Sequence, residues 1–214
     1  MYLAIEGVIG VGKTSLAHLL QPLFDSELLL EVFEENPFLS GFYSDRKRYA
    51  FQTQIFFLLS RYRQQREAVP RLQARGNLIA DYTFEKDALF ARLNLEGDEL
   101  DTYSLVHEAL AERLARPDLI VYLRVDTPTA MGRIGKRDRS YERNMDREYI
   151  EQLNQAYESF FAHRAGDRVL TIDSSPLDFV SQNEHLTYVA NRIRDALGIP
   201  PYQPELPFAG GPGA

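Results

Sequence analysis

One glycine-rich segment constrains the fold of this chain more than any other feature. It follows the apolar run Tyr2–Glu6 directly and reads Gly7-Val8-Ile9-Gly10-Val11-Gly12-Lys13-Thr14-Ser15, which fits the pattern G-x-x-x-x-G-K-[ST] at every required position. Glycines let consecutive backbone N–H groups turn inward around an anion, and the helix that follows presents its positive N-terminal end. A glycine-rich turn can serve chain geometry alone, but the Lys-Thr pair in this frame favours a phosphate-binding loop.

This loop predicts a site for a phosphate donor, which we expect to be ATP. In such a loop Lys13 reaches the β- and γ-phosphates, and the hydroxyl group of Thr14 ligates Mg²⁺. The loop does not identify the phosphate acceptor, so the acceptor has to be argued from other parts of the chain.

Short apolar runs alternate with longer amphipathic runs along the chain. This order is typical of parallel strands joined by helices, so we expect a three-layer α/β fold with a five-stranded parallel sheet and helices on both faces. The expected strands are Tyr2–Glu6, Leu28–Phe33, Leu78–Tyr82, Leu119–Val125 and Val169–Asp173. The expected helices lie near Lys13–Phe24, Tyr49–Arg75, Leu100–Arg116, Pro128–Arg137, Arg147–His163 and Val180–Leu197.

The composition excludes several classes of protein. A formal net charge of −7 argues against polymeric nucleic acid as a partner, because such binding depends on Lys and Arg that neutralise phosphates. The chain has no Cys, which excludes disulfides and thiolate sites and is compatible with a cytoplasmic location. No apolar run approaches the roughly 20 residues of a membrane helix, and no basic region precedes the first strand, so we expect neither a membrane partner nor a secretory signal.

We expect residues 1–197 to form one domain and residues 198–214 to form a tail. The 214 residues suit a single core, and no composition break divides the first 197. The tail is rich in Pro and Gly, so it cannot keep a helix or a strand ladder. It could pack on the surface through Tyr202, Leu206 and Phe208, which the sequence does not decide.

Two carboxylates are expected at the carboxyl ends of strands, where open α/β sheets place their ligands. Glu31 interrupts the second apolar run, and Asp81 follows Leu78-Ile79-Ala80. Either carboxylate could accept the proton of an attacking hydroxyl group, and an acid in the position of Asp81 commonly holds Mg²⁺ or its water shell. We favour Glu31 for the proton and Asp81 for the metal.

A kinase and a nucleotide-dependent switch are the two function classes that such a loop allows. A guanine-specific switch would carry an Asn/Thr-Lys-x-Asp motif, which is absent. The sequence therefore favours a kinase, with a non-enzymatic nucleotide-binding protein as the less favoured alternative.

Several further residues resemble the motifs of one kinase family. Glu31 follows the loop and the second strand, Tyr43 is followed by Gln54 eleven residues later, the third strand closes with Asp81-Tyr82-Thr83, and an Arg-rich segment occupies residues 133–143. The chain thus resembles the deoxyribonucleoside kinases, and most closely their bacterial deoxyadenosine/deoxyguanosine kinase branch.

The resemblance extends over residues 1–197 and implies a P-loop kinase fold with an Arg-rich lid around residues 133–146. It implies transfer of the γ-phosphoryl group of ATP to the 5′-hydroxyl group of a purine deoxynucleoside, with Mg²⁺, in nucleotide salvage. It also implies a homodimer, for which Tyr49–Arg75 is a candidate surface.

Roles for individual residues follow from the same resemblance. Gln54 would bond the edge of the base, and Tyr43 with Glu142 would hold the sugar 3′-hydroxyl group and exclude a 2′-hydroxyl group. Gln54 could instead coat a helix surface, and Tyr43 could be a surface-loop aromatic. Arg137 and Arg139 would stabilise the transferred phosphoryl group.

Four further assignments are less certain in their details. Arg133 is expected nearer the adenine ring or the outer phosphates, Arg61 is a candidate base contact, and either Lys86 or Asp87 faces the base. The His residues at 18, 107, 163 and 185 lack ligand spacing and are expected to be structural.

Tyr82 is expected by its position in the resemblance to contact the substrate, but it departs from the family pattern, because most members carry Arg at this position. Without that Arg, the charge next to the proton acceptor must come from an Arg of the lid or from another group. The loss also removes a clamp for a substrate phosphate, which argues against the alternative of a nucleoside monophosphate kinase of the thymidylate kinase type. By resemblance the Asp-Tyr variant favours deoxyguanosine over deoxyadenosine.

Overall fold

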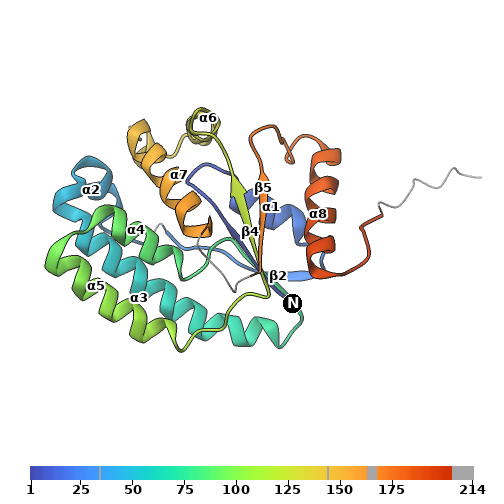
Figure 1. Cartoon of the computed structure of the whole chain (residues 1–214), viewed down its shortest axis with the longest axis horizontal. Helices are drawn as coiled ribbons and strands as arrows, with labels where there is room; N and C mark the ends of the chain where they lie inside the picture. The colour runs from blue at the N-terminus through green and yellow to red at the C-terminus, as the bar shows by residue number, and fades with distance from the viewer. Residues whose placement is uncertain (34, 144, 163–167, 204–214) are drawn as a thin grey trace, which may run out of the picture.

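The computed structural model describes residues 1–33, 35–143, 145–162 and 168–203. Five parallel strands form one sheet in the order β2-β3-β1-β4-β5. Helices cover both faces, with α1 and α8 on one side and α3, α4 and α7 on the other (Figure 1). The expected three-layer α/β fold is therefore confirmed. The strands are β1 (Tyr2–Glu6), β2 (Ser26–Leu29), β3 (Asn77–Ala80), β4 (Leu119–Arg124) and β5 (Val169–Asp173).

The central strands explain why the sheet is parallel. Every residue of β1 is buried, and β4 is buried except for Arg124 at its end. Strands with apolar side chains on both faces need a cover on each side, and parallel neighbours need a crossover that a helix can supply. The phosphate-binding loop follows β1 in the middle of the sheet, so it lies between the two halves of the molecule.

The helices agree with the expected ones except at their ends and for two additions. The short helix α2 and helix α4 were not predicted, because Lys86 and Asp87 place buried charges in the first turn of α4 and obscure its apolar face. Tyr49–Arg75 belongs to one long helix, α3, as expected. The helices are α1 (Lys13–Leu20), α2 (Leu39–Ser44), α3 (Arg46–Gln73), α4 (Lys86–Asn94), α5 (Gly97–Ala111), α6 (Thr127–Arg137), the 3₁₀ turn η1 (Ser140–Glu142), α7 (Arg147–Ala162) and α8 (Asn183–Leu197).

Strand β2 ends earlier than expected. The apolar run predicts a strand as far as Phe33, but the ladder stops at Leu29. Beyond it, the backbone N–H of Glu31 donates to Oδ1 of Asp81 at 2.8 Å. The carboxylate of Asp81, and not a backbone carbonyl of β3, thus accepts this hydrogen bond. Glu31 therefore lies in the loop after β2 and not within the strand.

The Arg-rich segment leaves α6 through a tight turn. Asp138 ends α6 with φ 48°, in the left-handed region, and η1 follows before α7 begins. Across this turn the guanidinium group of Arg143 bonds the carboxylate of Asp138 at 2.7 and 3.0 Å. This geometry returns the chain toward the loop after β1.

Only the beginning of the tail can be compared with the expectation. Residues 200–203 form no helix or strand, and the backbone N–H of Tyr202 donates to Oδ1 of Asn191 in α8 at 2.6 Å. Leu206, Phe208 and His163 lie outside the described residues. None of the helices in the described ranges is long and apolar enough to cross a membrane.

Replacement of Gly7 by Ala should destabilise the fold. Gly7 has φ +146°, and an added Cβ would lie 2.5 Å from the carbonyl oxygen of Leu123 in β4. Backbone strain and a backbone clash together should lower the free energy of unfolding by at least ~2 kcal/mol. Urea denaturation of Gly7→Ala measures this loss.

The matched control is Gly135→Ala in α6, where nothing lies within 4 Å of the added Cβ. This change should leave stability equal or raise it by up to about 1 kcal/mol, because Ala favours a helix over Gly. Equal stability of the Gly7 variant and the wild type would contradict the strain argument.

Candidate active site

The phosphate-binding loop holds its lysine in an inward position. Nζ of Lys13 donates to the carbonyl oxygens of Gly7 at 2.7 Å and Val8 at 3.2 Å. Burial, together with the nearby ammonium group of Lys86, lowers the pKa of Lys13 to about 8. The loop therefore holds a cation that a phosphate group can recruit away from the two carbonyl oxygens.

Glu6, at the end of β1, fixes the start of the loop. One of its carboxylate oxygens accepts hydrogen bonds from the backbone N–H of Thr83 at 2.5 Å and the Thr83 hydroxyl group at 3.0 Å. The other accepts from the N–H of Gly7 at 3.2 Å and from the hydroxyl group of Tyr157 at 3.1 Å. The sequence analysis gave Glu6 no role, although a carboxylate that ends a wholly buried strand was a usable signal.

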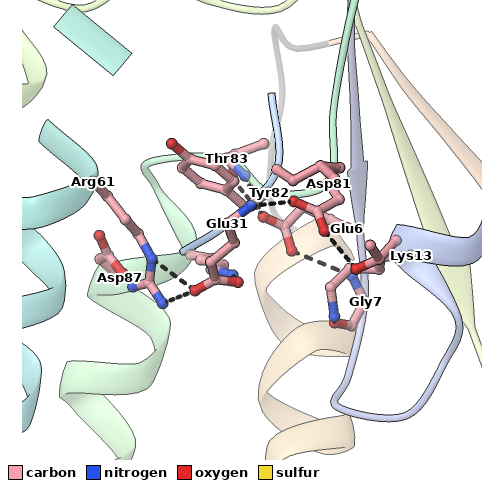
Figure 2. A network of polar contacts seen from close by, with 12 residues as sticks. Glu6, Gly7, Lys13, Glu31, Arg61, Asp81, Tyr82, Thr83 and Asp87 are labelled. Atoms are coloured by element: carbon pink, nitrogen blue, oxygen red, sulfur yellow. Dashed lines mark hydrogen bonds and ion pairs between the residues drawn. The ribbon is translucent and has the colours of Figure 1, made fainter. Parts of the chain in front are cut away.

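Asp81 joins the loop to the end of β2. Its Oδ2 accepts from the hydroxyl group of Thr14 at 2.5 Å. Its Oδ1 accepts from the N–H of Glu31 at 2.8 Å, a contact that Figure 2 marks with a dashed line. Asp81 is 3% exposed. A hydroxyl group and one buried carboxylate are hard oxygen ligands that suit Mg²⁺, which is usually bound by one or two carboxylates together with phosphates and water.

No group of three or more His, Cys, Asp or Glu side chains that could hold a metal occurs among the described residues. A magnesium ion that is carried mainly by nucleotide phosphates does not need one. The pair of Thr14 and Asp81 therefore fits the expected metal, and the ion would depend on the bound nucleotide.

The carboxylate of Glu31 contacts two cations. Its Oε1 accepts from Nε of Arg61 at 2.9 Å and also from Nη2, and its Oε2 accepts from Nζ of Lys86 at 2.5 Å. Burial favours the neutral acid, but Arg61 and Lys86 outweigh it and hold the pKa of Glu31 far below its usual range. Glu31 is therefore ionised and able to accept a proton.

Arg61 bridges two acids. Its guanidinium group lies between Glu31 and Asp87 (Figure 2), and Nη1 forms an ion pair with the fully buried carboxylate of Asp87. Lys86 thus contacts the carboxylate of Glu31, while Asp87 contacts Arg61. Most family members carry Arg at position 82, where this chain has Tyr82. Arg61 or Lys86, which both contact Glu31, can supply the positive charge that such an Arg would provide.

A cavity connects this charged cluster to the base-binding candidates. Gln54 and Tyr43 both line it, so neither is a plain surface residue. Gln54 is only 3% exposed, so its side chain is held inside the protein next to this cavity. Aromatic residues missed by the sequence analysis form most of the remaining wall: Phe33, Phe42, Phe57, Phe90, Tyr141, Tyr149 and Tyr157.

Tyr82 and Asp87 lie behind this cavity and not on its wall. The ring of Tyr82 packs in a second apolar cluster with Tyr2, Leu29 and Val69. Its hydroxyl group donates to Oε1 of Gln64 at 2.6 Å. The expected direct contact of Tyr82 with the substrate is therefore not part of this geometry.

Glu142 and the lid arginines face the cavity from the opposite side. Nη2 of Arg137 donates to both carboxylate oxygens of Glu142, at 2.7 and 2.6 Å, and Nη1 of Arg139 lies 3.7 Å from the same carboxylate. The guanidinium group of Arg139 also lies 4.0 Å from the ring centre of Phe33. Burial raises the pKa of the Tyr43 phenol well above its ordinary value, so this group remains a neutral hydrogen-bond donor.

Arg133 lies on the other side of the loop. Its guanidinium group donates to the carbonyl oxygens of Val11 at 2.9 Å, Ser174 at 2.8 Å and Leu177 at 2.9 Å. It lines a second, open groove with the loop after β1, with α6 and with residues 175–181. Arg133 therefore ties the helix to the phosphate-binding loop at the entrance of a groove that can take the rest of a nucleotide.

The sequence profile of one family, described as Deoxynucleoside kinase, matches residues 3–197. The chain belongs to this family. A deoxyguanosine kinase of Bacillus subtilis (strain 168) is 34% identical over 201 residues, which cover 92% of this chain and 97% of the relative. A deoxyguanosine kinase of Lactobacillus johnsonii is 32% identical, over 89% of this chain and 90% of the relative.

Solved structures agree with the sequence relatives. A deoxyadenosine kinase from M. mycoides, solved with dCMP and dCDP, has a TM-score of 0.80 and 29% identity over 91% of this chain and 100% of its own. The same protein with dATP bound has a TM-score of 0.79. The chain is thus a kinase that phosphorylates deoxynucleosides.

The lowered pKa of Lys13 predicts that nucleotide affinity depends on pH. Below about pH 8 the ammonium group is charged before the nucleotide binds, whereas above it binding must also recharge the amine. The dissociation constant for ATP should therefore rise above pH 8, by up to about tenfold for each further pH unit. Calorimetric titrations between pH 6.5 and 9.5 measure this slope.

Two variants make this test specific. Lys13→Met should bind ATP weakly and lose the slope, while Lys47→Met, which removes an exposed lysine at the start of α3, should retain it. A dissociation constant for the wild type that stays flat to pH 9.5 contradicts the assignment to Lys13.

Proposed function

We propose that this kinase transfers the γ-phosphoryl group of ATP to the 5′-hydroxyl group of a purine deoxynucleoside and prefers deoxyguanosine. The observation that carries the proposal is the shared cavity, which the phosphate-binding Lys13 and the buried amide of Gln54 both line, with Glu31 also on its wall. A nucleoside in it would reach the phosphates with its 5′ end and Gln54 with its base. Deoxyadenosine is the alternative acceptor.

Glu31 is the proposed general base. The 5′-hydroxyl group gives its proton to this carboxylate, the 5′-oxygen bonds to the γ-phosphorus atom, and the bond to the bridging oxygen of ADP breaks. Asp81 and Thr14 would hold Mg²⁺, which supplies neutralisation of the phosphate charge. Asp81 accepts from the hydroxyl group of Thr14 in the phosphate-binding loop, which supports a role of Asp81 on the donor side and of Glu31 as the proton acceptor.

The arginines of the lid are proposed to act on the phosphates. Arg137 and Arg139 lie on the cavity side and can turn from Glu142 to the transferred group, where developing charge favours guanidinium donors. Arg133 would border the adenine or the outer phosphates of ATP in the second groove. Residues 133–146 would then form the lid of a kinase domain that spans residues 1–197, followed by the tail 198–214.

Base and sugar recognition are proposed to lie on α3 and around η1. The amide of Gln54 can both donate to and accept from the base edge, and Arg61, which Asp87 holds from behind the cavity, offers a further donor next to it. A guanine edge carries N–H donors as well as O6 and N7 acceptors, so such a mixed set suits it. Tyr43 and Glu142 would hold the sugar 3′-hydroxyl group.

The cellular setting follows from the same chemistry. A kinase that phosphorylates free deoxynucleosides serves nucleotide salvage, and we place it in the cytoplasm. A homodimer is proposed through the outer surface of α3, where Leu59 is 50% exposed, and of α5, where Leu105 is 71% exposed.

A coupled assay of ADP release identifies the acceptor. We expect turnover with deoxyguanosine first, deoxyadenosine second and little with thymidine monophosphate or guanosine, because Tyr43 lines the sugar end of the cavity. All four deoxynucleosides are assayed under the same conditions. Preference for the monophosphate would assign the chain to a different acceptor class, and ATP binding without turnover would remove the kinase proposal.

Replacement of Glu31 by Gln should lower kcat by about 10²–10⁴-fold, since the amide cannot accept the proton. ATP affinity should change less than about threefold, because Glu31 belongs to the acceptor side of the cavity. Glu35→Gln, which alters an exposed carboxylate in the following turn, is the matched control and should behave as the wild type. Turnover of the Glu31 variant near the wild-type value would transfer the role to Asp81.

A further inference from the structure

Lys86 occupies a position that is unfavourable for a cation. It is the first residue of α4, is 4% exposed, and lies where the helix dipole is positive. It is also close enough to Lys13 to lower the pKa of that second ammonium group. Packing or solubility would place an apolar or exposed residue there, so the charge itself needs an explanation.

The contacts of Lys86 explain its position. Nζ lies 2.5 Å from Oε2 of Glu31 and 5.5 Å from the ring centre of Tyr82, and the side chain lines the acceptor cavity. Arg61 contacts only Oε1 of the same carboxylate. The two cations therefore divide the two oxygens, and Oε2 retains a lone pair for an acceptor hydroxyl group.

Tyr82 supports this arrangement from behind. Its hydroxyl group donates to Oε1 of Gln64, and Nε2 of Gln64 donates to the carbonyl oxygen of Leu30 at 2.8 Å. The segment that carries Glu31 is thus fixed through Leu30, and the face of the Tyr82 ring receives the ammonium group. Tyr82 provides packing and a hydrogen bond, while Lys86 provides the charge.

We propose that Lys86 is a positioning residue for phosphoryl transfer: it orients Oε2 of Glu31 toward the acceptor hydroxyl group and offsets the charge that develops on the acceptor oxygen. When the carboxylate takes up the proton it becomes neutral, and the charge of Lys86 is then no longer balanced by Glu31. That charge faces the oxygen that bonds to phosphorus, where it stabilises the transition state more than the bound substrate. This inference rests on the proposed role of Glu31.

Other charged or titratable groups interact with this pair from every side. They are Arg61 in α3, Lys13 in α1, Asp81 after β3, Asp87 in α4, Glu6 in β1 and Tyr157 in α7. Loss of Lys86 leaves Arg61 as the only cation in contact with the Glu31 carboxylate among the described residues.

The test is Lys86→Met, which keeps much of the side-chain length but removes the charge. We expect kcat with deoxyguanosine to fall about 10²-fold. The KM of the deoxynucleoside and the affinity for ATP should change less than about threefold, because Lys86 acts on Glu31.

Three further variants keep the test falsifiable. Lys86→Arg should recover at least about a tenth of the wild-type kcat, and Lys47→Met, an exposed lysine, should match the wild type. Lys86→Gln replaces the Met variant if thermal unfolding shows that the latter does not fold. A merely structural role would lower the melting temperature and leave the kcat of the folded Lys86→Met protein close to the wild-type value.

The outcomes separate this inference from the proposed function. A kcat within threefold of the wild type, no recovery of kcat in Lys86→Arg, or a raised KM at unchanged kcat each overturns the role of Lys86 while the kinase assignment stands. Absence of wild-type turnover on every deoxynucleoside overturns the proposed function and this inference with it.

Discussion

The carboxylate of Asp81 is the interaction on which the site depends. With one oxygen it binds the hydroxyl group of Thr14 in the phosphate-binding loop, and with the other it binds the backbone of Glu31 beyond β2. The order of the strands makes this possible, because β3, which Asp81 follows, lies between β1 and β2. One buried side chain thereby fixes the donor and acceptor halves of the site relative to each other.

Charge balance is the second organising principle of the site. The buried acids Glu31 and Asp87 are matched by Arg61 and Lys86, and the fully charged set is thereby tolerated in a region with little water. Such a cluster keeps Glu31 ionised, as a general base must be. When Glu31 takes up a proton, it no longer balances the positive charges of Arg61 and Lys86, which can then act on the substrate. Across the cavity, the carboxylate of Glu142 pairs with Arg137 and Arg139 in a similar way.

Local signals in the sequence were sufficient for the sheet and the loop. β1 and β5 have the expected ends, and the glycine-rich segment connects β1 to the helix that begins at Lys13, as its strand–loop–helix pattern predicts. Both depend on neighbours in sequence, namely apolar runs and a spacing of glycines. The end of β2 was not predicted correctly, because the N–H of Glu31 donates to the side chain of Asp81 and not to a backbone carbonyl of the neighbouring strand.

The partners of Glu31 could not be predicted in this way. Arg61 is 30 residues away and Lys86 is 55 residues away, and their convergence depends on how α3 and α4 pack on the sheet. For the same reason spacing alone left both Lys86 and Asp87 as candidates for the base. The structure shows that these two consecutive residues of α4 have different partners in the cluster. Lys86 pairs with Glu31, and Asp87 pairs with Arg61.

Most family members carry Arg at position 82, whereas here Tyr82 provides packing and Lys86 provides the charge. This division of roles has an evolutionary consequence. The space beside Oε2 of Glu31 holds one cation, and the space behind it holds one ring. An Arg introduced at position 82 would bring a second positive charge to the same oxygen and remove the support for Leu30. Positions 82 and 86 should therefore change together during descent, so that the pair of residues, and neither one alone, is the unit that selection preserves.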